Sequence, residues 1–423
     1  MDKETLSLIT IPIFTGAIGY VTNLSGVWML FYPIRFRGIR LPGLKALANV
    51  LPRRIQQIPG VLQGGLGWQG IVPSRAGKMG SIAVDKGIAK LGSPSDFYDQ
   101  LDSEAIAEHV LDSAGEEVHD VVERIMERER PQLWHDLPAR LRKAVHARVQ
   151  EQLPAIVRTI TDEVGAHADQ LLNVKLMVVR HLEETPELAN RIFLEVGRRE
   201  LRFIVRFGFF FGFLLGIPTA YLTVEVWTMW WLLPIIGVLI GYTTNLLGIR
   251  MIFEPVRPRR IGPLTIHGLF LKRQPEVAGV YADIIANDIV TIDNMAEDLL
   301  RGPNSDRTRR MIELALRPVV DEAVGRARPA VRVAVGRRGY DQIRSSIASE
   351  ATDRTMAPLT DPEFARAQSQ GIRDFVAARV SQMDPASFSE MLRTAMREDE
   401  WLLYLHGAVL GFGAGLLHLA VFG

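Results

Sequence analysis

A polar motif occurs twice in this chain, each time near the end of an uncharged run long enough to cross a bilayer. Gly-Tyr-Val-Thr-Asn-Leu-Ser-Gly at 19–26 returns as Gly-Tyr-Thr-Thr-Asn-Leu-Leu-Gly at 241–248. The copies share further residues at constant spacing: Pro12 and Pro234, Met29 and Met251, Phe31 and Phe253, Pro33 and Pro255, Arg35 and Arg257, Arg37 and Arg259, Ile39 and Ile261. Such a repeat predicts two related halves.

Four stretches contain no charged residue: Leu6–Pro33, Phe207–Val224, Val226–Ile249 and Trp401–Gly423. A helix crosses the bilayer core in about 20 apolar residues, and buried helices of soluble proteins rarely run this long without a charge. We therefore predict a four-span integral membrane protein. Residues 1–34 hold the first transmembrane helix, residues 203–254 a hairpin of the second and third, and residues 401–423 the fourth.

Basic residues close to the spans predict the orientation of the chain. They follow the first span, precede the second and follow the third: Arg35, Arg37, Arg40 and Lys45, then Arg198, Arg199, Arg202 and Arg206, then Arg257, Arg259 and Arg260. The positive-inside rule places the segments between the spans in the cytoplasm, with both termini and the 224–226 turn outside. The short N-terminus lacks a signal-peptide cleavage pattern, which fits a multi-pass protein of the bacterial inner (plasma) membrane.

The two long polar segments, 35–202 and 255–400, are predicted to be helical lobes. Apolar residues recur at three- and four-residue steps through 104–127, as in an amphipathic helix, and alternating strand patterns are absent. The predicted fold class is therefore all-α.

The repeat continues through the lobes. Gly70–Arg75 matches Gly268–Arg273, and the ladder Gly208, Gly212, Gly216 matches Gly407, Gly411, Gly415. Each half then comprises a span, a basic loop, a helical lobe and a glycine-rich span, which predicts two parallel repeats.

About two dozen extra residues lie between Ile39 and Gly70 in the first half. They combine an apolar stripe with basic residues, which suits the headgroup layer, where each Lys or Arg contributes about 1 kcal/mol on anionic lipid. A surface helix packed on its own lobe is the alternative. The predicted headgroup contacts are Arg35, Arg37, Lys45, Arg53, Arg54, Arg257 and Arg259.

The ordered set of motifs resembles the domain-of-unknown-function 445 family of bacterial membrane proteins. The resemblance rests on Gly19–Asn23 with Met29, Phe31 and Pro33, on their second copy, on Gly70–Arg75, and on Glu200–Ile204 before the glycine ladder. The second copy departs at Leu271, which replaces a proline, and at Asp399–Trp401. The resemblance implies membrane residence and helical lobes, and it brings no activity, cofactor or catalytic residue.

The repeated motif places hydroxyl and amide groups inside the spans: Tyr20, Thr22, Asn23, Tyr242, Thr244 and Asn245. One interpretation is hydrogen bonding between the first and third spans, worth about 0.6 kcal/mol per bond. The other is a polar pathway at the repeat interface, where transporters bind solutes. None of the four spans supplies an Asp, Glu, Lys or Arg that could couple an ion or relay a proton. This favours the packing interpretation. His406 and His418 in the fourth span are expected to hydrogen-bond neighbours.

Small residues predict where helices approach closely. The packing glycines are Gly19, Gly26, Gly241 and Gly248 together with the two ladders. The ladders could join the two halves or join separate protomers, and the pattern does not choose between these.

The sequence offers little for catalysis. It has no cysteine, Walker loop, dinucleotide fingerprint or His-Glu-x-x-His motif. Glu116, His119, Asp120 and Glu123 share a helical face, but no second ligand set completes a metal site. We therefore predict no enzyme, cofactor or metal, and a net charge of +1 gives no argument for nucleic acid.

We interpret the chain as a structural scaffold or adaptor, with the lipid bilayer and its anionic headgroups as one partner. A homo-oligomer or an envelope protein is a further possible partner. Two alternatives stay open: a transport component with a polar pathway between the repeats, and a lipid-handling protein.

Overall fold

The computed structural model describes residues 3–43, 50, 52–56, 58–62, 64–115, 118–227, 229–324 and 328–422. The chain forms two compact units. The membrane unit comprises Met1–Lys90, Val179–Tyr281 and Ala378–Gly423, and the second unit comprises Leu91–Val178 and Ala282–Ala377. Each predicted lobe therefore contributes its first and last parts to the membrane unit and only its middle to the second unit.

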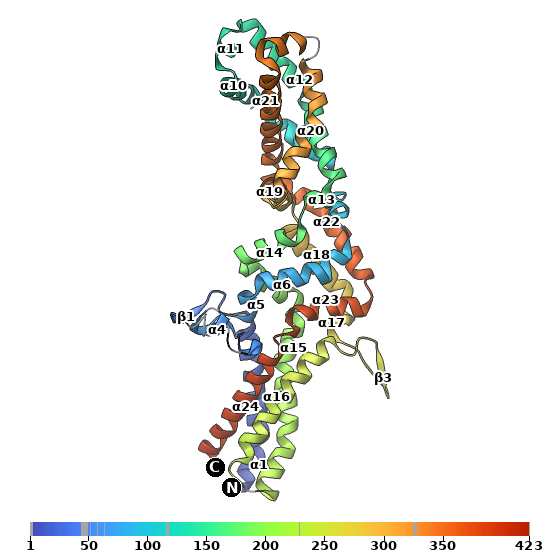
Figure 1. Cartoon of the computed structure of the whole chain (residues 1–423). Coiled ribbons are helices and arrows are strands. Elements are labelled where there is room, and N and C mark those ends of the chain that lie inside the picture. The colour runs from blue at the N-terminus through green and yellow to red at the C-terminus, as the bar shows by residue number, and fades with distance from the viewer. Residues whose placement is uncertain are drawn as a thin grey trace. The chain divides into compact units, whose positions relative to one another are not determined.

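Four helices of the membrane unit are long and apolar enough to cross a membrane (Figure 1). They are α1 (Lys3–Phe31), α15 (Pro186–Tyr221), α16 (Leu232–Phe253) and α24 (Glu400–Phe422). The four predicted membrane helices are thereby confirmed.

The turn between the second and third spans differs from the prediction. A π-helical turn, η2 (Leu222–Val226), ends α15, and α16 starts at Leu232 rather than at Val226. Three tryptophans near this turn are exposed: Trp227, Trp230 and Trp231. Tryptophan favours the boundary between membrane and water, which fits a turn of the chain at the membrane surface here.

Helix α15 carries the chain from the charged region into the apolar run without a break. It begins at Pro186, a residue suited to the first helical position, and spans 36 residues. The predicted boundary between residues 202 and 203 therefore falls inside one continuous helix.

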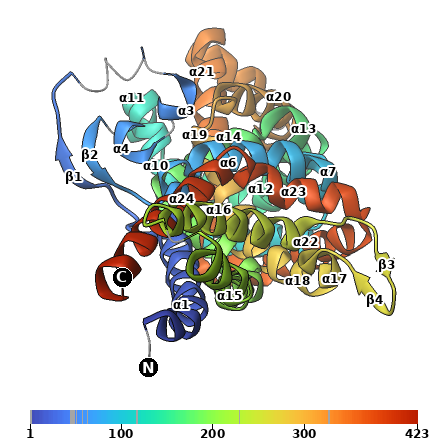
Figure 2. The same ribbon diagram turned by 90° about the horizontal axis from the view of Figure 1, so that it is seen from below.

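The four helices pack as a bundle in the cyclic order α1, α15, α16 and α24. The closest pairs are α1 with α15 and α16 with α24, which are the two spans of each predicted half. Figure 2 shows this bundle from the end that carries both termini. Helices α1 and α16 run in the same direction, each leading from that end to a β-hairpin (Figure 1).

These two hairpins are an exception to the predicted all-α fold. Strand β1 (Arg37–Arg40) pairs antiparallel with β2 (Gly65–Trp68), and β3 (Arg259–Ile261) pairs antiparallel with β4 (Leu264–Ile266). The strands have three or four residues, too few for alternation to be recognised in the sequence.

Short helices complete the membrane unit, some of them running on into the second unit. They are α3 (Arg53–Gln56), α4 (Pro59–Leu62), α5 (Ile71–Ser74), α6 (Ala76–Ala83), η1 (Val84–Ile88), α7 (Ala89–Leu91), α14 (Val174–Glu184), α17 (Leu269–Lys272), α18 (Gln274–Ile284) and α23 (Pro385–Arg397). The longer helix α22 (Pro362–Gln382) lies mostly in the second unit and ends in the membrane unit.

The second unit is helical in its described residues. Its elements are α8 (Pro94–Tyr98), α9 (Ser103–Gly115), α10 (Val118–Glu129), α11 (Pro131–Asp136), α12 (Ala139–Ala166), α13 (Ala168–Leu171), η3 (Ile285–Ile289), α19 (Ile292–Arg301), α20 (Ser305–Val324), α21 (Arg328–Met356) and η5 (Ala357–Thr360). The amphipathic helix predicted at 104–127 is thus divided into α9 and α10.

The core of the second unit forms where α12 packs against α9 and α20. Val110, Ile160 and Ile312 are fully buried there. Leu141 and Val145, in the N-terminal half of α12, are exposed. The buried face of α12 therefore lies in the C-terminal half of the helix.

Candidate functional site: the polar centre of the membrane bundle

The two asparagines of the repeated motif make equivalent hydrogen bonds. Asn23 Nδ2 donates to the backbone carbonyl of Ile204 in α15 at 2.6 Å, and Asn245 Nδ2 donates to that of Leu403 in α24 at 2.6 Å. The predicted pairing between the first and third spans is therefore not what the asparagines do. Each one bonds the neighbouring span of its own half.

Glycines make this contact possible because they bring the two backbones together. A Cβ atom at Gly19 would collide with the carbonyl of Gly208, and one at Gly241 would collide with the carbonyl of Gly407. Cβ atoms at Gly212 and Gly216 would meet Thr15 and Pro12 of α1 at 2.6 Å.

The second half repeats this arrangement. A Cβ at Gly411 would collide with Gly237, and one at Gly415 would meet Pro234 at 2.5 Å. Each ladder therefore joins the two spans of its own half in this structure, rather than joining the two halves.

Gly26 and Gly248 have a different role. A Cβ at Gly26 would lie 3.6 Å from Leu403, and one at Gly248 would lie 3.7 Å from Phe207. These are ordinary contact distances, and each is made to a span of the other half. The predicted packing glycines therefore divide into tight contacts within a half and looser contacts between halves.

A cavity of about 40 Å³ lies in the centre of the bundle. Its wall is mostly apolar, and the polar residues in it come from all four helices: Thr15, Thr22, Asn23, Thr219, Thr244 and His418. A water molecule needs roughly 10–15 Å³ and two to four polar partners, so the volume admits a few waters but the mostly apolar wall offers few groups to bind them. Asn23 Oδ1 is buried and accepts no hydrogen bond from a described residue.

Tyr20 and Tyr242, the remaining members of the predicted polar motif, do not line this cavity. Their side chains are 41% and 42% exposed on the outer surface of the bundle. The structure therefore brings the threonines and Asn23 to one cavity and leaves both tyrosines away from it.

The two histidines of α24 contact α1. His406 Nε2 lies 2.9 Å from Ser25 Oγ, and His418 Nε2 lies 3.4 Å from Thr10 Oγ1. Both hydrogen-bond a neighbouring helix, as we expected. His418 also lines the central cavity, a position that its spacing in the sequence did not indicate.

Two arginine–carboxylate pairs join the halves at the end of the bundle that carries the hairpins. Arg75 of the first half pairs with Asp399 of the second, and Arg273 Nη1 of the second half donates to Glu200 Oε1 of the first at 2.6 Å. Asp399 and Glu200 are 3% and 2% exposed. The sequence aligned Arg75 with Arg273 and Glu200 with Asp399, but it could not show that the partners cross between halves.

A third carboxylate shares Arg273. Arg273 Nε donates to Glu276 Oε2 at 2.8 Å. This hydrogen bond lowers the pKa of Glu276 below its ordinary value, and it likewise raises the pKa of Arg273.

The predicted headgroup residues that the structure describes lie on or beside the hairpins. Six arginines there are exposed and have no carboxylate within salt-bridge distance among the described residues: Arg35, Arg37, Arg40, Arg257, Arg259 and Arg260. Lys45 lies outside the described residues. Arg53 and Arg54 begin the short helix α3, and only their backbone is described.

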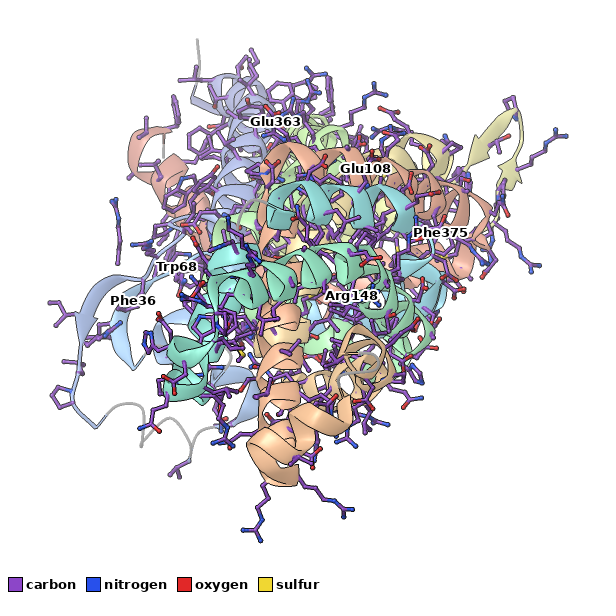
Figure 3. All side chains as sticks on the ribbon, turned by 90° about the horizontal axis from the view of Figure 1, so that it is seen from above. Phe36, Trp68, Glu108, Arg148, Glu363 and Phe375 are labelled. Carbon is purple, nitrogen blue, oxygen red and sulfur yellow. The ribbon has the colours of Figure 1, made fainter. Side chains whose placement is uncertain are left out.

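The β1–β2 hairpin presents apolar side chains beside its arginines. Ile39 faces Leu66 in the strand register, and these side chains are 73% and 69% exposed. Trp68 Nε1 donates to the Met29 carbonyl at 3.3 Å, which ties the hairpin to α1. Figure 3 labels Trp68 and Phe36 at this hairpin.

The chain is similar to curated proteins described as UPF0754 membrane proteins. It is 39% identical over 90 residues to one from Synechococcus elongatus, a stretch covering 20% of this chain and 19% of that protein. It is 32% identical over 113 residues to one from Shouchella clausii, covering 22% and 30%. The chain thus matches less than a third of the length of these relatives.

No family model matches the chain, and no solved structure matches it. The similarity to bacterial membrane proteins and the four apolar helices together identify a helical, multi-pass membrane protein whose relatives are uncharacterised.

Proposed function

We propose that this protein is a non-enzymatic scaffold of the bacterial inner membrane, built from two parallel copies of one unit. The observation that carries the proposal is the set of six exposed arginines on and beside the two hairpins, which lack carboxylate partners among the described residues. Each set directly follows a span, where Lys or Arg contributes about 1 kcal/mol on anionic lipid.

Matched contacts support the two-copy architecture. The asparagine hydrogen bonds, the tight glycine contacts and the hairpins occur once per half at equivalent positions. A parallel duplication accounts for all of them, because each copy would use the same residues to close its own pair of spans. We also propose, from the motifs above, that the chain belongs to the domain-of-unknown-function 445 family.

The proposed orientation puts the hairpins and the second unit in the cytoplasm. It follows from the positive-inside rule, because the arginines are concentrated at the hairpin end of the bundle, whereas Glu225 lies at the opposite end. Anionic lipid in the cytoplasmic leaflet would then face the basic hairpins.

Lipid composition tests the headgroup contact. The purified protein would be reconstituted in nanodiscs made from equal parts of phosphatidylglycerol and phosphatidylcholine, and the retained lipid would be quantified. We expect enrichment of phosphatidylglycerol, and its loss when Arg35, Arg37, Arg257 and Arg259 are changed to Gln. Equal lipid ratios around both proteins would contradict the contact.

Cross-linking tests the scaffold role. After cross-linking in native membranes, purification should recover a reproducible protein partner or a homo-oligomer of this chain. Recovery of the bare monomer under conditions that cross-link a known membrane complex would contradict a scaffold.

A second candidate function is a pathway for water or a small cation, favoured by the central cavity. Thr22, Asn23 and Thr244 line this otherwise mostly apolar cavity from both halves, and its volume of about 40 Å³ admits only water-sized species. Replacing Thr22 and Thr244 by Val removes two hydroxyls while conserving shape. Lost sodium, potassium or water flux in proteoliposomes, with unchanged folding, would favour this function over packing alone.

A further inference from the structure

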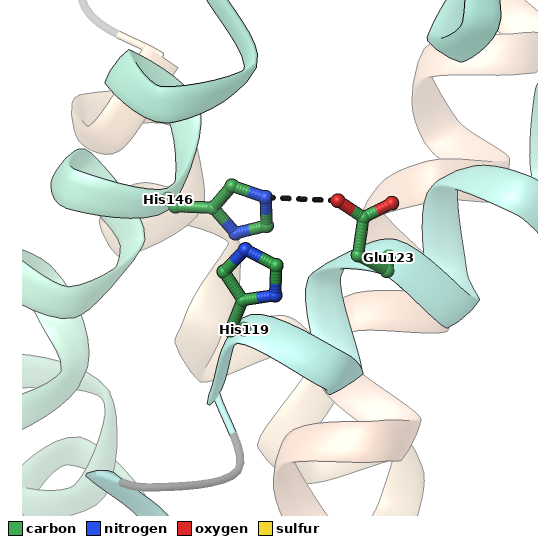
Figure 4. Close-up of side chains that lie close together, drawn as sticks. All are labelled: His119, Glu123 and His146. Atoms are coloured by element: carbon green, nitrogen blue, oxygen red, sulfur yellow. Dashed lines mark hydrogen bonds and ion pairs between the residues drawn. The ribbon is translucent and has the colours of Figure 1, made fainter. Parts of the chain in front are cut away.

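Three potential metal ligands converge in the second unit, outside the membrane bundle. His119 and Glu123 lie one turn apart on α10, and His146 reaches them from α12 (Figure 4). One ligand atom from each lies within 4.8 Å of the others. The sequence showed an acidic helical face at 116–123 but no ligand to complete a site, because His146 is distant along the chain. Glu116 of that face lies outside the described residues.

The spacing of two of these groups already suits a metal. His146 Nε2 lies 3.2 Å from Glu123 Oε1. Ligand atoms bound at 2.0–2.1 Å in a tetrahedral zinc site are about 3.4 Å apart. A zinc ion could therefore replace the proton between this nitrogen and oxygen with little movement of either side chain.

A buried tryptophan holds the carboxylate in position. Trp134 of α11 is 1% exposed, and its Nε1 donates to Glu123 Oε2 at 2.5 Å. This bond fixes one carboxylate oxygen and directs the other toward His146. Hydrogen bonds of this kind orient metal ligands and raise the affinity of a site.

The ring nitrogens of the two histidines have few neighbours outside the cluster, among them Asp120 Oδ1 at 3.9 Å from His119 Nδ1. His146 Nδ1 is buried and has no hydrogen-bond partner among the described residues. Buried polar atoms without partners are uncommon and often mark functional sites. The His119 ring stacks on that of His146 with centroids 3.9 Å apart and planes 8° from parallel. An imidazole binds a metal in its ring plane, so His119, whose side chain is 64% exposed, has to rotate off His146 to join a shared ion.

We propose that His119, Glu123 and His146 bind a Zn²⁺ ion that pins α10 to α12. Two imidazoles and one carboxylate form the ligand set of zinc sites that keep a fourth position open to water. The exposure of His119 gives the ion a route from solvent. The site is independent of the proposed scaffold function, because it uses none of the membrane helices or hairpin arginines.

Zinc titration of the full-length protein in detergent, purified without a polyhistidine tag, tests the site. Competition with a chromogenic zinc chelator should give one Zn²⁺ per chain. The His146→Ala and His119→Ala variants should each lose at least about 100-fold in affinity, since even outer-shell changes cost 10–100-fold. Co²⁺ in place of Zn²⁺ should give the visible absorption of a tetrahedral site.

Two further variants keep the test decisive. Glu123→Gln retains an oxygen acceptor for Trp134, so it should stay folded by circular dichroism yet bind Zn²⁺ more weakly by a similar factor. His135→Ala removes an exposed histidine of α11 outside the cluster and should bind like the wild type. The proposal is overturned if no stoichiometric zinc binds, or if the three ligand variants bind as tightly as His135→Ala.

Discussion

The two halves of the membrane bundle agree closely inside each pair of spans and differ where the halves meet. Within a half, an asparagine amide and a ladder of glycines hold the two spans together, with equal 2.6 Å hydrogen bonds. Between the halves, Arg75 pairs with Asp399 in a nearly sealed environment, whereas Arg273 divides its hydrogen bonds between buried Glu200 and exposed Glu276.

The contacts within a half and the contacts between halves therefore place different demands on the sequence. Close backbone packing tolerates no variation, because a single Cβ would collide with the facing carbonyl, so both halves retain glycine. An ion pair needs only a compensating charge within reach, so the Arg75–Asp399 and Arg273–Glu200 pairs can differ in burial. The predictions below use that contrast.

The largest effect is expected at the buried pair of Arg75 and Asp399. Asp399→Ala leaves the guanidinium of Arg75, which is 6% exposed, without this carboxylate. Loss of one partner of a buried pair costs about 3–5 kcal/mol. Glu200→Ala should cost less, about 1.5–3 kcal/mol, because Arg273 is 22% exposed and keeps Glu276. Unfolding by SDS titration from mixed micelles measures both, and equal losses would contradict the contrast.

The glycine contacts should respond equally in the two halves. Gly208→Ala and Gly407→Ala each force a side chain against a facing carbonyl, and overpacking of this kind costs about 1–3 kcal/mol. Gly413→Ala is the matched control on α24, because a Cβ there meets nothing within 4 Å. The same SDS titration should leave Gly413→Ala at wild-type stability; a loss confined to one half would argue against equivalent packing.

The asparagine bonds should contribute less. Asn23→Ala and Asn245→Ala each remove one hydrogen bond between helices, worth about 0.6 kcal/mol on average in membranes. We expect two small and similar shifts in the unfolding midpoint. If either variant failed to fold, its asparagine would have a larger role than its single bond explains.

The smallest effect concerns the pH dependence of stability at Arg273, which bonds exposed Glu276 as well as buried Glu200. The hydrogen bond from Arg273 lowers the pKa of Glu276 in the folded state. The stability that this group contributes is therefore complete above the ordinary Glu pKa, about 4.3, and is lost as the pH falls through the lowered folded value. Thermal melts between pH 7 and pH 3 should show a slightly shallower acid decline for Glu276→Gln. An unchanged profile would mean that Glu276 is not coupled to folding.

The sequence predicted those features that depend on local pattern. Uncharged runs located the four long helices, because lipid requires an apolar surface of fixed length. The duplicated motif likewise identified Asn23, Asn245 and the glycines as packing residues before their partners were known.

Features that depend on which elements become neighbours could not be predicted. Asn23 bonds α15 rather than α16 because of the order of helices around the bundle, and Arg75 crosses to Asp399 for the same reason. The hairpins were missed because their strands are too short for a periodic signal, and His146 because its partners lie on another helix.

Cysteine accessibility tests most directly the central claim that two parallel units cross the membrane and place their polar regions on the same cytoplasmic side. The chain has no native cysteine, so single cysteines at Ser103, Ser305 and Thr223 report without background. In intact spheroplasts, an impermeant maleimide should label the Thr223 site and should reach the other two only after permeabilisation. Labelling of the Ser103 and Ser305 sites in intact cells would reverse the proposed orientation, and labelling of only one of them would contradict the parallel arrangement itself.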